Sequence, residues 1–120
     1  MAQNLEVSLL LDFYGPLLTT KQREVVEFYH NEDLSFSEIA ENEGITRQGV
    51  RDTILRTEAI LRDMEEKLGL CKRFRDMTEG LERVRRAAQD IETFNDRYGY
   101  RREISSRAKE IIDVADALSE

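Results

Sequence analysis

Apolar side chains recur every three to four residues along almost the whole chain, which is the spacing of amphipathic helices. No segment alternates apolar and polar residues with the period of two that a half-buried strand needs. Pro16 is the only proline, so little in the sequence interrupts helix formation. The pattern therefore predicts an all-α fold.

Two short helices are predicted near the N-terminus. The first should end at Gly15–Pro16, because proline rarely continues a helix. The spacing gives it a face made of Leu5, Leu9, Asp12 and Phe13, with Leu10 and Leu11 beside it. The second should begin at Thr19, which can form a capping box with Gln22. Its inward face should consist of Val25, Val26, Phe28 and Tyr29.

The segment 35–55 has the layout of a helix-turn-helix. Ser35, with Glu38 three residues later, predicts a capping box at the start of a helix. Gly44 stands where that helix must stop, and Thr46 can cap the next one. We therefore expect two helices joined by a tight turn, in a helix-turn-helix domain of residues 1–68.

Nine residues have assigned roles in this motif. The expected scaffold is Ala40, which is small where the helices cross, Gly44 in the turn and Val50 between the helices. The second helix should present its N-terminal end to base edges in the DNA major groove. The residues expected to face DNA are Thr46, Arg47, Gln48, Arg51, Asp52 and Leu55. Arg can pair bidentately with guanine and Gln with adenine, so these side chains suit that role.

The recognition helix should be long, from residue 46 to 68, because its apolar spacing continues far beyond the motif. The same spacing resumes in the 69–120 extension, with Gly80 as a candidate kink. Two uses of these apolar seams remain open: packing within one chain, or an interface between two copies. Residues 1–68 leave the long helices little core to lie against, so we favour a homodimer.

Charge changes the picture, because 25 acidic and 18 basic residues give a net charge of −7. DNA-binding domains usually carry the opposite sign. Residues 1–62 contain 6 basic and 11 acidic residues, and the remainder contain 12 and 14. Between Arg47 and Arg62, however, four arginines outnumber Asp52 and Glu58, which leaves a local basic strip.

The C-terminal half also carries basic clusters between Lys72 and Lys109, and an aromatic-basic run at Tyr98–Arg102. A phosphate or acidic protein is one candidate ligand for them. The alternative is the solvated face of an amphipathic helix, because acidic residues lie at helical pairing distances from these cations. For Tyr98–Gly99–Tyr100 the alternatives are stacking on a base or a turn that ends a helix at Gly99.

The inventory of reactive residues argues against an enzyme. One histidine and one cysteine cannot make a structural zinc site or an internal disulfide. We interpret His30 as a polar cap at a helix end and Cys71 as structural or incidental. No glycine-rich phosphate loop or nucleophile elbow is present, so we expect no catalysis, no cofactor, no metal and no small-molecule substrate. No signal peptide or membrane-spanning segment is apparent, which favours the cytoplasm without membrane insertion.

Residues 19–62, with the run TTKQREVVEFYHNEDLSFSEIAENEGITRQGVRD, resemble region 4 of primary sigma factors, the part that docks on promoter DNA. A wider resemblance takes in LLLDFYGPLL, ILRTEAIL and EEKLGL and is to the small bacterial YlxM family. That resemblance implies an all-helical, sigma-region-4-like regulator that binds double-stranded DNA. Genes of that family neighbour those of the signal recognition particle GTPases, which implies components of that particle as partners.

The resemblance assigns groove-facing roles to Arg47, Gln48 and Arg51. Gly49 departs from the family pattern, in which alanine or a charged residue is usual at this position. Glycine inside a helix costs roughly 0.5–1 kcal/mol relative to alanine, so the working end of the recognition helix should be softened. Two hypotheses follow. The first is a dimeric DNA-binding regulator. The second is an interaction protein that contacts the signal recognition particle GTPase or its RNA, because an acidic helical protein would be attracted to a basic surface.

Overall fold

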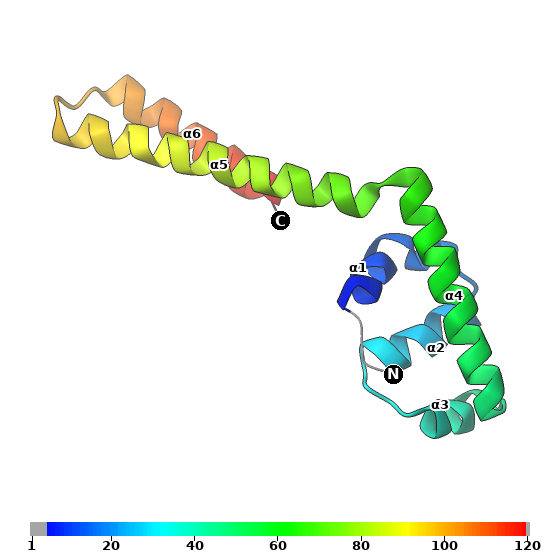
Figure 1. Cartoon of the computed structure of the whole chain (residues 1–120). Coiled ribbons are helices and arrows are strands. Elements are labelled where there is room, and N and C mark those ends of the chain that lie inside the picture. The colour runs from blue at the N-terminus through cyan, green and yellow to red at the C-terminus, as the bar shows by residue number, and fades with distance from the viewer. Residues whose placement is uncertain (1–4, 120) are drawn as a thin grey trace. The chain divides into compact units, whose positions relative to one another are not determined.

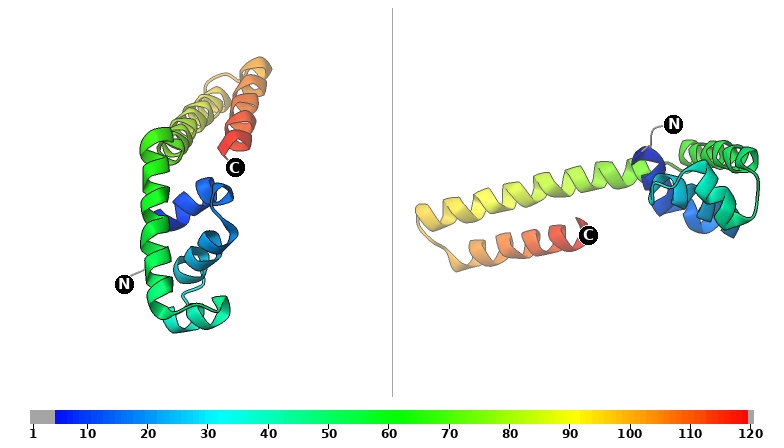
Figure 2. Two further views of the ribbon diagram at one scale, coloured as in Figure 1. Left: turned by 90° about the vertical axis from the view of Figure 1, so that its right-hand side faces the viewer. Right: turned by 90° about the horizontal axis from the view of Figure 1, so that it is seen from below.

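The computed structural model describes residues 5–119. These residues form six α-helices and a short 3-10 helix, and none of them lies in a strand, which confirms the predicted all-α class (Figures 1 and 2). The helices are α1 (Leu5–Tyr14), η1 (Gly15–Leu17), α2 (Thr20–His30), α3 (Phe36–Glu43), α4 (Arg47–Leu68), α5 (Leu70–Arg97) and α6 (Arg102–Ser119).

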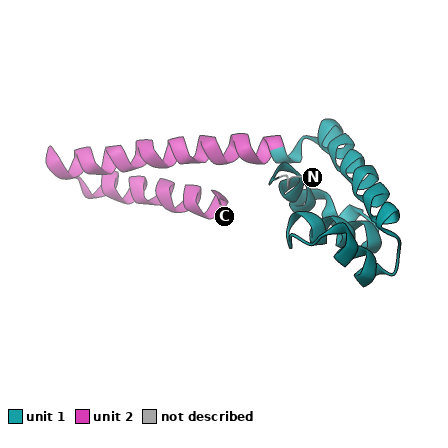
Figure 3. Ribbon diagram, turned by 60° about the horizontal axis from the view of Figure 1, so that its bottom comes forward, with its two compact units in different colours: residues 1–71 teal, residues 72–120 magenta. Residues whose placement is uncertain are grey.

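The chain divides into two compact units (Figure 3). Unit 1 comprises residues 1–71 and contains the helices α1 to α4 together with the first residues of α5. Unit 2 comprises residues 72–120 and contains the rest of α5 and the helix α6.

Helix ends in unit 1 follow the local signals in the sequence. Thr19 caps α2, where its hydroxyl accepts a hydrogen bond from the Gln22 amide and the Gln22 side chain accepts one from the Thr19 amide. At the other end of the unit, Gly69 closes α4 with a φ of 63°, a left-handed conformation that favours glycine.

The core of unit 1 consists of two apolar clusters. The first lies between α1, α2 and the C-terminal half of α4, and the second lies between α2, α3 and the N-terminal half of α4. Leu61 belongs to the first cluster, whereas Val50 and Ile54 belong to the second. The helix α4 is therefore common to both clusters and holds the helix-turn-helix onto the rest of the unit.

The predicted inner face of α1 was wrong. Leu5 is 87% exposed, and Leu9 and Phe13 are only partly buried. The fully buried positions are Val7, Leu10, Leu11 and Tyr14. Because α1 carries apolar residues almost all round, its spacing selects no single face, and contacts with α2 and α4 decide which side is covered.

His30, interpreted from the sequence as a polar cap at a helix end, lies in the last turn of α2 but is buried. Its imidazole is buried, and Nε2 lies 2.8 Å from Oε2 of Glu58 on α4. Oε1 of Glu58 lies 3.5 Å from the Arg62 guanidinium. Burying the Glu58 carboxylate without such partners would be costly, so this group ties α2 to α4.

The first turn of α5 is attached to unit 1 by a polar network. The Tyr14 hydroxyl donates to Oε1 of Glu65 at 2.6 Å and accepts from the Leu70 amide at 3.1 Å. Oε1 of Glu65 also accepts from the Cys71 amide at 3.0 Å. The Cys71 thiol is buried in the first apolar cluster, which agrees with a structural role.

Unit 2 is a pair of antiparallel helices joined at residues 98–101 (Figure 2). The helix α5 continues across Gly80 without a break. Asn95 holds the connection: its Nδ2 donates to the Arg101 carbonyl, and its Oδ1 accepts from the Arg101 amide, each at 2.9 Å. Gly99 in this connection has a φ of 111°, so the run Tyr98–Tyr100 forms a turn.

Candidate nucleic-acid interface

The first helix of the motif, α3, begins with a capping box. The Ser35 hydroxyl accepts from the Glu38 amide at 3.1 Å, and the Glu38 carboxylate accepts from the Ser35 amide at 3.0 Å. Hydrogen bonds from the Ser35 backbone and then from its hydroxyl hold the pKa of Glu38 below its ordinary value. The start of α3 is therefore fixed by its own side chains.

The turn between the motif helices is built on Gly44, which has a φ of 67° and a ψ of 34°. The amides of Gly44 and Ile45 both donate to the Ala40 carbonyl, and the Ile45 bond is 3.1 Å long. Thr46 then caps α4, where its hydroxyl accepts from the Gly49 amide at 2.9 Å. Helix, turn and helix thus follow each other within a few residues.

The proposed scaffold residues lie where the two helices meet. Val50 is fully buried and Ala40 nearly so, and both belong to the cluster that contains Ile39 and Ile54. Gly44 lies in the turn and is exposed. The sequence assigned these three residues to such positions, and the apolar contacts of Ile39 and Ile54 complete the junction.

All six residues that were expected to face DNA are exposed. Gln48, Arg51 and Leu55 are separated by three and four residues, so they share one side of α4. Arg47 adjoins them on the first turn, one helical turn before Arg51. The N-terminal end of α4 therefore presents two cations, an amide and an apolar side chain together.

The cations of this end are not paired. Within residues 5–119, Arg47, Arg51 and Arg56 of α4 make no ion pair, whereas Arg23, Arg62 and Lys67 of the same unit each lie against a carboxylate. This contrast matters because unit 1 holds 14 acidic residues and only 7 basic ones. Two guanidinium groups at this end of α4 thus remain available in acidic surroundings.

Asp52 modifies this surface. Its Oδ1 accepts a hydrogen bond from Nε2 of Gln48 at 3.1 Å, one turn earlier on α4. The bond orients the Gln48 amide, but it also places a carboxylate next to a surface that would meet phosphates. Asp52 therefore opposes the attraction that Arg47 and Arg51 provide.

The presence of glycine at position 49 has a geometric reason that could not be predicted from the sequence. A Cβ at this position would lie 3.2 Å from the hydroxyl oxygen of Thr46, which is closer than ordinary contact. That hydroxyl is the one that caps α4 through the Gly49 amide. The glycine thus leaves room for the cap at the end of α4 that carries the exposed cations.

A contact between acidic side chains of α2 and α3 could not be predicted from the sequence, because only the fold brings the two helices together. The pKa of Glu43 at the end of α3 is raised, first by burial and then by a hydrogen bond to the Glu24 carboxyl on α2. The negative charge of Glu24 raises it further, while Lys21 acts in the opposite direction. Two acidic groups, one on α2 and one at the end of α3, are therefore in contact.

Residues 5–119 contain neither a candidate metal site nor a helix that could span a membrane. No group of three or more His, Cys, Asp or Glu side chains there has the arrangement to hold a metal ion. None of the helices in the described chain is both long and apolar enough to cross a membrane.

Comparison with known families supports the interpretation of the motif. The family model described as "Putative helix-turn-helix protein, YlxM / p13 like" matches residues 1–98. The chain belongs to this family. The match covers all of unit 1 and all of α5, and the α3–α4 segment described above lies within it.

Individual UPF0122 proteins from several bacteria are similar to this chain over 69 to 88 residues. The UPF0122 protein of Thermoanaerobacter sp. (strain X514) is 47% identical over 85 residues, which cover 71% of this chain and 73% of the relative. The UPF0122 protein of Acetivibrio thermocellus is 56% identical over 69 residues, or 58% and 59% of the two chains. That of Limosilactobacillus reuteri is 42% identical over 88 residues, or 73% and 78%.

Proposed function

We propose that the protein is a regulatory protein that binds double-stranded DNA through the N-terminal end of α4. The contact residues are Thr46, Arg47, Gln48, Arg51, Asp52 and Leu55, with Ala40, Gly44 and Val50 as the scaffold. The observation that carries the proposal is the pair of exposed, unpaired arginines on the second helix of a helix-turn-helix. The role involves no catalytic step and no cofactor, and it takes place in the cytoplasm.

The acidic charge of unit 1 limits how tightly such an interface binds. The excess of seven acidic residues repels a duplex as a whole, whereas Arg47 and Arg51 attract phosphates only at close range. Salt screens charges beyond about 8–10 Å at physiological ionic strength, so distant carboxylates matter less than adjacent arginines. We expect weak non-specific affinity, with a Kd of about 10⁻⁴–10⁻⁶ M.

The test is a fluorescence anisotropy titration of labelled random duplex DNA with wild type and two matched variants. Arg51→Ala should weaken binding roughly tenfold at about 50 mM salt and flatten the slope of log affinity against log salt by about one. Arg86→Ala removes the same charge from an exposed position on α5 and should change the affinity less than about twofold. Equal losses in both variants would mean that net charge, and not the motif, controls binding.

A second candidate is an interaction protein that contacts the signal recognition particle, either its GTPase or its RNA. What favours it is the charge distribution, because the whole net charge of −7 resides in unit 1 and unit 2 carries 11 basic and 11 acidic residues. An acidic unit would be attracted to a basic protein surface.

This candidate is tested by retention of the protein on immobilised signal recognition particle GTPase at low salt. Glu32→Lys with Glu41→Lys, both exposed in unit 1, should abolish retention, whereas the same double reversal at the exposed Glu79 and Glu103 of unit 2 should not. Absence of retention of the wild type would exclude a direct contact with the GTPase.

A further inference from the structure

The helices of unit 2 each carry a seven-residue repeat of which only half is covered. In α5 the positions Leu81, Ala88 and Asn95 face α6 and are buried or half-buried. The other apolar positions of the repeat, which lie open, are Met77, Val84 and Ile91, and Tyr98 continues the spacing just beyond the end of α5. A two-stranded coiled coil would cover both sets, so this helix pair is a different arrangement.

The helix α6 repeats this division. Ala108 and Ala115 are each 2% exposed, whereas the exposed fractions of Ile104, Ile111 and Leu118 range from 40% to 60%. Small side chains thus form the contact between the two helices, and large apolar side chains lie outside it. Neither apolar cluster of buried residues in the described chain includes a residue of unit 2.

The large side chains of α5 and α6 lie on the same side of the pair. One flank of the contact is closed by ion pairs, between Arg85 and Asp116 at 2.9 Å and between Glu92 and Lys109 at 3.9 Å. These pairs come one position after the buried residues of α6, so in an antiparallel pair the remaining apolar positions of both helices turn to the opposite flank. We call that flank the open face.

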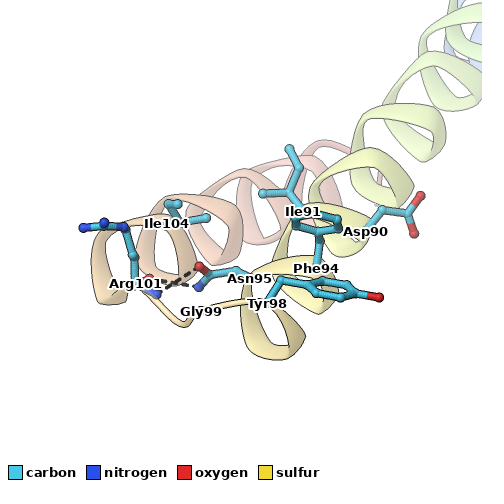
Figure 4. Close-up of a pocket in the computed structure, with 8 residues that line it drawn as sticks. All are labelled: Asp90, Ile91, Phe94, Asn95, Tyr98, Gly99, Arg101 and Ile104. Carbon is cyan, nitrogen blue, oxygen red and sulfur yellow. Dashed lines mark hydrogen bonds between the residues drawn. The ribbon is translucent and has the colours of Figure 1, made fainter.

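A hollow at one end of the open face shows both helices contributing to it. The hollow has a volume of about 470 Å³, and its apolar lining comes from Ile91 and Phe94 of α5, Tyr98 just after α5 and Ile104 of α6, with Asp90, Asn95 and Arg101 at its polar positions (Figure 4). The rings of Phe94 and Tyr98 are 4.7 Å apart, and both are mostly exposed. Such an apolar patch on two adjacent helices is typical of an interaction surface.

We propose that a second copy of this chain covers the open face, so that two α5–α6 pairs form a four-helix bundle. In such a bundle each helix turns half of its repeat to its neighbour in the chain and half to the other pair. That is the division seen here in both helices. A two-fold axis would bring identical open faces together, and the large side chains of each face would cover those of the other.

Charge and size are consistent with this occupant. Unit 2 carries no net charge, so two copies of it do not repel each other as two copies of unit 1 would. Each helix of the pair is about 10 Å wide, and α6 is about 27 Å long, so a face of two helices covers on the order of 500 Å² in projection. Both copies together reach about 1,000 Å², which is the lower bound for a specific interface.

Light scattering after size exclusion tests the proposal on the full chain. The wild type should have twice the mass of the 14.0 kDa chain. Ile91→Asp and Ile104→Asp should each raise the dimer dissociation constant at least roughly 100-fold, because a carboxylate would be buried without a partner. Thr93→Asp, exposed two residues after Ile91 on the outer side of α5, should remain a dimer.

A monomeric wild type would overturn the proposal, and so would a dimer that both aspartate variants leave intact. Hydrogen exchange on the wild type alone gives a second measurement that does not depend on how the variants fold. Amides of α5 and α6 should lose protection when the protein is diluted below its dimer dissociation constant, while those of α2 should not. Protection of α5 and α6 that is independent of concentration would contradict the proposed interface.

Discussion

Glycine serves two different purposes at the residue scale, and the difference can be measured. Gly44 has a φ of 67°, and no atom lies within 4 Å of the position that a Cβ would occupy. Gly80 lies inside α5 with equally open surroundings but with ordinary helical geometry. Any effect of alanine at either position therefore comes from the backbone and not from a clash.

Gly44→Ala should lower the free energy of unfolding by about 1–2 kcal/mol, because an L-residue is strained in the left-handed region. Gly80→Ala should raise it by about 0.5–1 kcal/mol, because alanine loses less backbone entropy in a helix. Urea unfolding followed by circular dichroism checks both. Equal effects of the two variants would show that the turn at residue 44 does not need glycine.

The carboxylate of Asp52, next to the residues proposed to contact DNA, should limit DNA affinity. Asp52→Asn removes the carboxylate beside Gln48 and leaves an amide that can still accept its hydrogen bond at 3.1 Å. Removal of one charge at about 4 Å from a phosphate in water is worth about 1 kcal/mol, so affinity for random duplex should rise roughly fivefold. Asp63→Asn on the same helix, outside the motif, is the control. A fall in affinity for Asp52→Asn would mean that this carboxylate contacts DNA productively.

At the scale of elements, the contact between α2 and α3 makes stability depend on pH. The pKa of Glu43 is raised above its unfolded value, by burial and by the Glu24 carboxyl. The stability that this group contributes is therefore complete at pH values below its unfolded pKa, and it is lost as the pH rises through its folded pKa. At neutral pH the carboxylate is an unfavourable group.

Glu43→Gln should raise the melting temperature at pH 7, and the gain should disappear below about pH 4, where the wild-type carboxyl is protonated. Glu38→Gln should act in the opposite direction. The folded pKa of Glu38 is lowered by hydrogen bonds from Ser35, so its contribution is complete above its unfolded pKa and is lost as the pH falls through its folded pKa. Melting curves between pH 3 and 8 test both variants, and a gain for Glu43→Gln that persists at low pH would refute the explanation.

Elements whose signals are local could be predicted from the sequence. The capping boxes at Thr19 and Ser35, and the glycine turn at residue 44, depend on residues that are at most a few positions apart. The buried face of α1 and the partner of His30 could not be predicted, because contacts with helices far along the chain decide them. Gly49 was interpreted as a weakness because its reason, the Thr46 hydroxyl, appears only once the helix is built.

At the scale of the whole molecule, the two units differ in charge and in how well they are packed. Unit 1 has buried apolar clusters and the whole net negative charge, whereas unit 2 is neutral and leaves its large apolar residues open. This division fits separate tasks: the first unit carries the helix-turn-helix, and the second is the unit that we propose joins two copies. A dimer would offer two motifs to one duplex, which raises affinity without new contacts on either motif.

We propose that this acidic protein binds DNA through the unpaired arginines at the N-terminal end of α4. This proposal is tested most directly by titrating labelled random duplex with the wild-type protein at about 50 mM and about 200 mM salt, with anisotropy as the readout. The account predicts binding at the lower salt and an affinity about a hundredfold lower at the higher salt, as expected for roughly four phosphate contacts. No binding at the lower salt, or an affinity that does not change with salt, would contradict it.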